Sequence, residues 1–71
     1  MPHKTFVEVD VEVHAQHEAA VLVSTDGDED SAGWVPYSTI SGHSSVNEFS
    51  NVGSCEVLIC EEWVALEKGL I

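Results

Sequence analysis

The chain has 71 residues, and its 13 Asp and Glu against two Lys and no Arg give a formal net charge of −11. This charge argues against direct binding to DNA, RNA or an anionic membrane surface, which would repel the protein, and indicates basic partners. The hydrophobic fraction of 44% is too high for a chain kept disordered by its charge. The length predicts a single domain, residues 1–71, with a small core.

No run of 18 or more apolar residues is present, and the first ten residues lack the apolar core of a signal peptide. We therefore expect a cytoplasmic protein. The two cysteines, Cys55 and Cys60, lie on one predicted strand, on opposite faces and about 16 Å apart. This separation excludes a disulfide between them while the strand is intact, and we expect both to be free, buried thiols.

The first predicted element is a strand over residues 5–14, where hydrophobic and charged residues alternate with period two. One face of this strand carries four Val residues, which favour β-structure. The other face carries Glu8, Asp10 and Glu12, followed by His14. The pattern predicts a core face and, opposite it, a row of carboxylates.

A turn over residues 15–19 leads into an apolar strand over residues 19–25, which we expect in the middle of a sheet and paired with the first strand as a hairpin. The segment "DGDEDSAG" is a solvated acidic loop. A third strand begins at Trp34 and stops at Pro36, because proline has no amide proton to give to a ladder.

Residues 41–54 are rich in Ser, Gly and Asn, and they predict a long irregular stretch that Val46 and Phe49 hold in place. Residues 55–62 predict the last strand. A short helix follows in "EEWVALEKGLI", with Gly69 after its last turn.

The predicted fold class is mainly β (α+β): a small bent antiparallel sheet or an SH3-like barrel of four or five strands with one short C-terminal helix. Trp63, Leu66 and Leu70 have the spacing of a buried helix stripe. We also expect Trp34 and Trp63 to be large anchors of the core.

Residues 20–71 resemble a group of small proteins encoded by bacteriophages and prophages. The resemblance rests on "WVPYSTI", which matches the pattern W-V/I-P-x-S-x-I, and on "EWVALEKGL", which matches E-W-x-A-x-x-K-G-L. The group often has Lys where this chain has Tyr37. The resemblance implies a phage origin, hence the cytoplasm of a bacterial host, and a small β-rich fold; it implies no catalytic residues.

Metal and catalytic chemistry find little support in the sequence. Asp26, Asp28 and Asp30 have the spacing of the first ligands of a calcium loop, but Ser31 and Tyr37 stand where such a loop needs Gly and Glu. The candidate zinc ligands are scattered and form no repeated pair: His3, His14, His17, His43, Cys55 and Cys60. No nucleophile motif is present. We therefore predict no enzyme activity, no cofactor and no metal site, although weak binding of a divalent ion stays an alternative.

The carboxylate row is the strongest functional signal. Its residues are about 6.6 Å apart along a strand, and two unit charges at that distance in water repel each other by about 0.6 kcal/mol. The row thus costs stability without a benefit to folding. We predict that it presents an acidic surface to a basic nucleic-acid-binding protein of the host. The predicted partner-binding residues are Glu8, Asp10, Glu12, Asp26, Asp28, Glu29 and Asp30.

The most specific form of this prediction is an inhibitor of a host defence complex that mimics nucleic acid. In size and acidity the chain resembles anti-CRISPR proteins and DNA-mimic inhibitors. Two alternatives stay open. One is a non-catalytic phage accessory or structural module that docks through apolar residues on a replication or virion protein. The other is a small metal-binding protein. The oligomeric state is not indicated.

Overall fold

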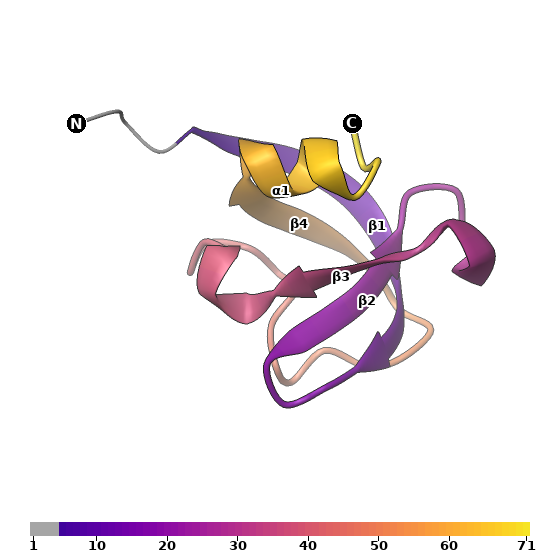
Figure 1. Ribbon diagram of the computed structural model, residues 1–71. Coiled ribbons are helices and arrows are strands. Elements are labelled where there is room, and N and C mark those ends of the chain that lie inside the picture. Colours follow the sequence, from indigo (N-terminus) through magenta and orange to yellow (C-terminus); the bar gives the residue numbers. More distant parts are fainter. Residues whose placement is uncertain (1–4) are drawn as a thin grey trace.

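Four strands form one antiparallel sheet in the order β3-β2-β1-β4 (Figure 1). The computed structural model describes residues 5–71. The strands and the helix that follows them are β1 (Phe6–Gln16), β2 (Ala20–Ser24), β3 (Gly33–Pro36), β4 (Cys55–Glu61) and α1 (Glu62–Glu67). Two single 3-10 turns, η1 (Glu29–Ser31) and η2 (Tyr37–Thr39), flank β3. The predicted mainly β fold with a C-terminal helix is confirmed.

Strand β1 is the longest strand and has different neighbours along its length. Its residues 6–12 pair with β4, and its residues 12–16 pair with β2. Val11 and Val13 are 4% and 0% exposed, whereas Val7 and Val9 are only partly buried. Burial on the core face therefore falls toward the half of β1 that β2 does not flank.

A β-bulge interrupts the β1–β2 pairing at His14. Val13 pairs with Val23 and Ala15 pairs with Leu22, so His14 is the extra residue on β1. A bulge bends its strand and turns one side chain away from the regular alternation. The predicted strand over residues 5–14 is thus longer than expected, because the bulge lets β1 continue to Gln16.

The core consists mainly of Val side chains from the inner faces of β1, β2 and β3, together with Leu58 and Cys60 of β4. Helix α1 lies across one side of the sheet (Figure 1) and buries Val64 and Ala65 in this core. Leu70, after the helix, is also buried. The prediction that residues 19–25 form a central strand is confirmed, since β2 lies between β1 and β3.

The predicted role of the two Trp residues was wrong. Trp34 is 43% exposed on β3 and Trp63 is 55% exposed on α1, and Leu66 is exposed as well. Helix α1 begins directly after β4, so the strand sets which side of the helix meets the sheet. With fewer than two turns available, the small pair Val64 and Ala65 brings the helix close to the core. Of the predicted stripe, only Leu70 is buried.

The end of α1 follows the prediction for Gly69. This glycine has a φ of 72°, a conformation that other residues adopt at a cost. Its N–H donates to the Leu66 carbonyl, and the Leu70 N–H donates to the Ala65 carbonyl (2.8 Å), as in a Schellman motif. No helix within residues 5–71 has the length and apolar character needed to cross a membrane.

The backbone edge of β4 that points away from β1 is covered by the serine-rich segment that follows η2. Ile40 forms a single bridge with Cys60, and the Ser41 N–H donates to the Ile59 carbonyl (2.7 Å). Further along, the Ser44 hydroxyl accepts from the Ile59 N–H (3.1 Å) and the Ser45 hydroxyl accepts from the Val57 N–H (2.8 Å). Serine side chains thus take the place of a fifth strand.

The irregular stretch over residues 41–54 is held as predicted by Val46, which is buried. Phe49 does not contribute, because 83% of it is exposed. Its N–H donates to the Asn47 side chain in a local turn that directs the ring outward. Cys60 is buried as predicted, but Cys55 is exposed, since it lies on the outer face at the first position of β4. Neither forms a disulfide.

Candidate functional site

The predicted carboxylate row lies on the outer face of β1. Glu8 and Asp10 are exposed, and the Glu12 side chain is 35% exposed. Their partners across the β1–β4 ladder on this face are Ile59, Val57 and Cys55. None of these partners is basic, so the strand β4 does not neutralise the row.

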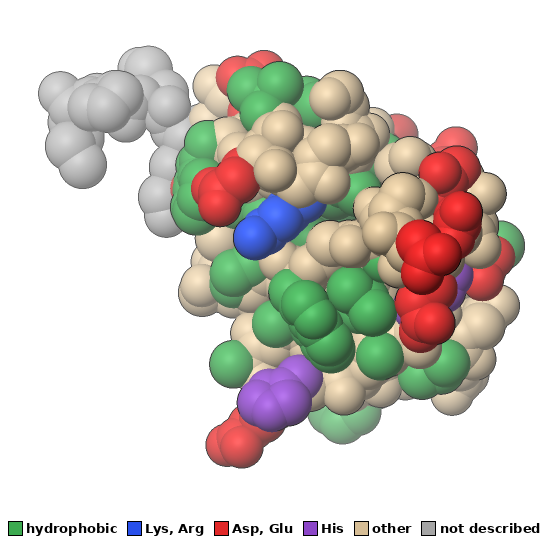
Figure 2. All heavy atoms as spheres, turned by 45° about the vertical axis from the view of Figure 1, so that its right-hand side comes forward, with side chains coloured by type: hydrophobic (Ala, Val, Ile, Leu, Met, Phe, Trp, Pro, Cys, Tyr) green, Lys and Arg blue, Asp and Glu red, His purple; other side chains and the backbone are tan. Residues whose placement is uncertain are grey.

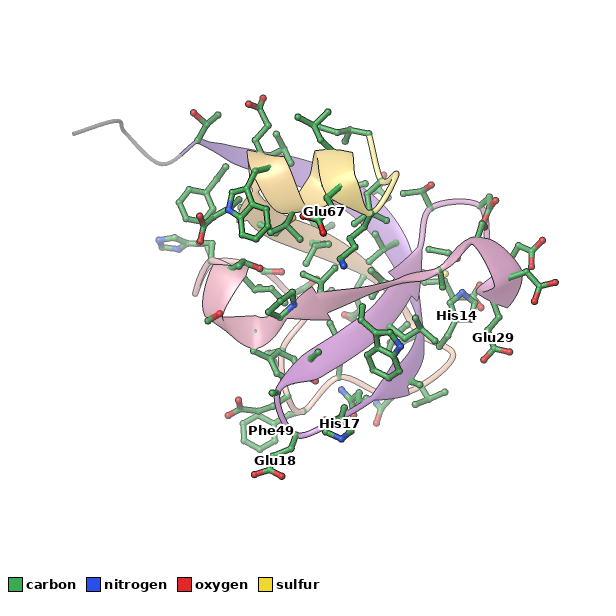
Figure 3. All side chains as sticks on the ribbon, in the orientation of Figure 1. His14, His17, Glu18, Glu29, Phe49 and Glu67 are labelled. Atoms are coloured by element: carbon green, nitrogen blue, oxygen red, sulfur yellow. The ribbon has the colours of Figure 1, made fainter. Side chains whose placement is uncertain are left out.

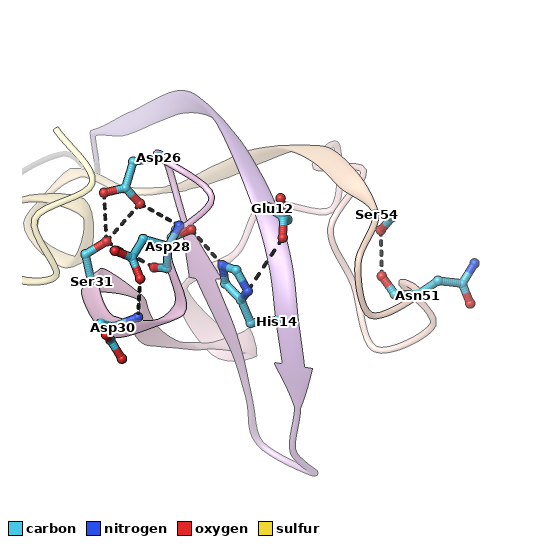
Figure 4. A network of polar contacts seen from close by, with 9 residues as sticks. Glu12, His14, Asp26, Asp28, Asp30, Ser31, Asn51 and Ser54 are labelled. Carbon is cyan, nitrogen blue, oxygen red and sulfur yellow. Dashed lines mark hydrogen bonds and ion pairs between the residues drawn. The ribbon is translucent and has the colours of Figure 1, made fainter.

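The second predicted acidic set forms a well-defined loop between β2 and β3. Asp26 Oδ1 accepts from the Asp28 N–H and Asp28 Oδ1 accepts from the Asp30 N–H, both at 2.9 Å (Figure 4). The Ser31 hydroxyl lies 2.8 Å from both carboxylate oxygens of Asp26. Asp28 caps the 3-10 turn η1. Asp26 and Asp28 therefore make successive Asx turns.

These contacts explain the acidity of Asp26. The hydrogen bond from the Asp28 N–H, and then that from the Ser31 hydroxyl, lower the pKa of the Asp26 carboxyl. A weaker contribution comes from the charge of His14. A carboxylate that accepts such bonds is stabilised in its charged form. Asp26 therefore stays negative while remaining on the surface.

The two acidic sets meet at one groove. Glu12 Oε1 lies 3.5 Å from the position that a Cβ atom on Gly27 would take, so the loop passes directly beside the row. Gly27 has a φ of 78°, which glycine adopts without strain. The groove has a volume of about 300 Å³ and is lined mainly by Asp10, Glu12, Thr25, Asp26, Gly27 and Cys55.

We call the residues Glu8, Asp10, Glu12, Asp26, Asp28, Glu29 and Asp30 the acidic surface. In Figure 2, acidic side chains form a band on the side of the molecule that lies to the right in Figure 1. Figure 3 shows Glu29 and His14 on this side, whereas Glu18 and Phe49 lie near the bottom of the view. Asp10 and Glu12 of the first predicted set and Asp26 of the second line the same groove.

His14 lies mostly below the surface, between Glu12 of β1 and Ser24 of β2. Its Nε2 shares a hydrogen bond of 2.7 Å with the Ser24 hydroxyl, and its Nδ1 lies 3.7 Å from Glu12 Oε2 (Figure 4). The order Glu, His, Ser has the appearance of a catalytic triad. Ser24 is only 1% exposed, however, so its hydroxyl lies inside the protein. The contact fastens the bulge of β1 to the end of β2.

No group of three or more His, Cys, Asp or Glu within residues 5–71 has the arrangement of a metal site. Of the candidate zinc ligands, His3 lies outside the described residues. The ring of His17 packs edge-on against that of Trp34, with the two ring centroids 6.4 Å apart. Burial, and to a lesser extent the charge of Glu61, raise the pKa of the Cys60 thiol, which favours its neutral form.

Two features of the site were missed from the sequence. The first is the bulge at His14, whose only signal is that the alternation ends in "VHAQ". The second is the contact of Glu12 with Gly27, which joins the row to the loop. It depends on the path of the β2–β3 connection, and no local pattern predicts it.

Comparison of the chain with protein-family models, with curated proteins and with solved structures found no match.

Proposed function

We propose that this protein acts by binding, and that its acidic surface occupies the basic nucleic-acid-binding surface of a host protein and blocks it. The observation that carries this proposal is the groove at which Asp10 and Glu12 of β1 meet Asp26 of the loop. Two acidic sets that are separate in the sequence form one face there. Arg and Lys that hold phosphates also pair with carboxylates, through the same charge-assisted hydrogen bonds.

The distribution of positive charge supports this proposal. The chain has only two Lys residues, and Lys68 lies 3.8 Å from Glu67 on the helix, over Gly33 of β3. No ion pair between a Lys and a member of the acidic surface is formed within the described part of the chain. The acidic surface is thus available to the charges of a partner. A host defence complex, as targeted by an anti-CRISPR protein of a phage or mobile element, is the proposed target.

The proposal is tested by competition. Labelled double-stranded DNA is bound to purified nucleases and CRISPR effector complexes of the bacterial host, and the protein is added at increasing concentration. For a target complex, we expect the DNA to be displaced, with an affinity that falls as salt rises from about 50 to about 200 mM. The target itself is found by affinity purification of the tagged protein from that host.

Matched variants decide whether the acidic surface is responsible. The triple variant Glu8→Gln, Asp10→Asn, Glu12→Gln removes three charges and keeps the side-chain shapes. We expect it to lose at least about tenfold in affinity for the target. The control Glu18→Gln, Glu48→Gln, Glu62→Gln removes three exposed charges elsewhere on the molecule. Equal losses in the two triple variants, or binding that does not respond to salt, would overturn the proposal.

A second candidate function is favoured by exposed apolar side chains of β1 and α1. Phe6 and Leu66 are 44% and 59% exposed, and Trp63 is held by a 2.9 Å hydrogen bond from its Nε1 to Glu61. An accessory or structural phage module would dock through these residues. In that case Trp63→Ala would abolish binding to a phage replication or virion protein, while the triple neutral variant would bind normally.

A further inference from the structure

Half of β1 has an unpaired backbone edge. Just beyond the two ends of the β1–β4 ladder, the Glu62 N–H donates to the Thr5 carbonyl (2.7 Å) and the Val13 N–H donates to the Ser54 carbonyl (2.9 Å). Hydrogen-bonding direction alternates along an antiparallel strand, so the odd-numbered residues of this part of β1 face β4. The N–H and C=O groups of Phe6, Glu8 and Asp10 therefore point the other way.

Strand β2 does not reach these groups, because it starts to pair with β1 only at Glu12. Within residues 5–71, no backbone hydrogen bond joins Phe6, Glu8 or Asp10 to a segment on that side. We call this stretch, residues 6–10, the open edge. An unpaired edge is a ready template for a further strand.

Burial on the core face of β1 also indicates that a neighbouring strand is missing beside residues 6–10. Val11 and Val13 are buried where β2 lies beside them, but Val7 and Val9, on the same face, are only partly buried. A strand added along the open edge would bring side chains next to Val7 and Val9. Apolar residues in those positions would complete the burial of this face.

The outer face of β1 indicates which charge an added strand should carry. Glu8 and Asp10 project from this face beside the open edge, and side chains of an added strand lie about 5 Å from those directly opposite. Opposite charges in such positions are favourable and like charges are unfavourable. A second copy of this chain would place carboxylates opposite carboxylates, so the edge favours a basic segment over self-pairing.

We propose that the open edge accepts an extended segment of a partner protein as an additional strand, in which basic residues alternate with apolar residues. The basic side chains face Glu8 and Asp10, and the side chain at one end enters the groove beside Asp26. The apolar side chains cover Val7 and Val9. This inference rests on the proposed function for the basic character of the partner and adds the conformation in which the partner is bound.

The test uses two synthetic peptides of equal composition and charge, KVRVKVR and KRKRVVV. Both are titrated into the full-length protein, and binding is followed by NMR. We expect KVRVKVR to bind at least about tenfold more tightly. It should slow hydrogen exchange of the Phe6, Glu8 and Asp10 amides by at least about tenfold. The Val7 and Val9 amides, which already face β4, should change little.

Two variants separate backbone pairing from charge. Asp10→Pro removes one N–H of the open edge without removing a β1–β4 bond, a position where a strand tolerates proline. Asp10→Asn keeps that N–H and removes only the charge. We expect Asp10→Pro to weaken KVRVKVR at least about tenfold more than Asp10→Asn does.

A second measurement does not depend on how the variants fold. N-methyl groups are placed on alternate amides of KVRVKVR, in two complementary sets. Only the set that points toward β1 should abolish binding to the unmodified protein. Equal binding of the two unmodified peptides, or equal effects of the two methylated sets, would overturn strand addition. Equal peptide binding that the triple neutral variant loses would leave the proposed function intact.

Discussion

The edge of β4 that points away from β1 and the open edge of β1 both lack a neighbouring strand. They differ in whether other groups bond to their backbone. On β4, serine hydroxyls bind the N–H groups of Val57 and Ile59. On β1, the corresponding groups of Glu8 and Asp10 have no such cover from the described residues. This contrast between the two edges is the basis of the proposed strand addition at the open edge.

The largest expected effect comes from uncovering the protected edge. The double variant Ser44→Ala, Ser45→Ala leaves two N–H groups of β4 without partners, and Ser44 is buried. The Val46 N–H, which is buried, loses the Ser44 hydroxyl as well, whereas the exposed Val57 N–H can bond to water. Each unsatisfied buried group costs about 1–3 kcal/mol, so for Ile59 and Val46 together we expect the free energy of unfolding to fall by about 3 kcal/mol. Urea denaturation measures this change.

The control for this double variant is Ser38→Ala, at an exposed serine, which should change stability by less than about 0.5 kcal/mol. If the double variant were as stable as the control, the serines would not be what covers β4. The contrast between the two edges would then disappear.

The next prediction compares the two halves of β1. Val13→Ala removes a fully buried side chain where β2 flanks β1, and we expect a loss of about 2 kcal/mol. Val9→Ala removes a partly buried side chain beside the open edge and should cost about half as much. At a saturating concentration of KVRVKVR, the stability loss of Val9→Ala should move closer to that of Val13→Ala, because the added strand would bury Val9. Thermal or urea unfolding with and without the peptide measures both.

The smallest effect concerns pH and the acidic loop. The hydrogen bonds from Asp28 and Ser31 lower the pKa of Asp26 below its ordinary value of about 3.9. Because the pKa of Asp26 is lower in the folded state, its charged form stabilises the loop at any pH above the ordinary aspartate pKa. This stabilisation is lost as the pH falls through the lower pKa of the folded state. We expect the signal of the Asp26 carboxyl carbon to titrate below about pH 3.9.

The variant Asp26→Asn is the control for the pH prediction. Its amide oxygen still accepts from the Asp28 N–H but has no charge to lose, so the acid transition of the side-chain carbonyl carbon of residue 26 should vanish. A titration of Asp26 at or above the ordinary aspartate value would contradict the proposed hydrogen bonds. NMR titration of the carboxyl carbon provides the measurement.

Much of the fold could be predicted because its signals are local. The alternation in β1, the end of β3 at Pro36 and the turn at Gly69 each depend on neighbouring residues. The covering of β4 could not be predicted, because serines that replace a strand have the same composition as a loop. The exposure of Trp63 could not be predicted either, since a helix of fewer than two turns is oriented by the strand before it.

The candidate site divides in the same way. The exposure of Glu8 and Asp10 followed from the period of the strand, and it is confirmed. That the loop would lie against Glu12 depended on the bulge at His14 and on the path after Ser24, which involve contacts between distant residues. Charge patterns in a sequence identify which residues are on the surface. They do not tell which of them share a face.

The Asx turns of the β2–β3 loop have a consequence for binding strength. Each turn fixes an Asp side chain against the backbone before any partner arrives. A flexible acidic loop would lose conformational entropy when it was ordered by a partner, about 0.5–1.5 kcal/mol for each side chain immobilised. In this loop much of that ordering is already present in the free protein. For the proposed basic partner, more of the attraction between opposite charges would then contribute to affinity.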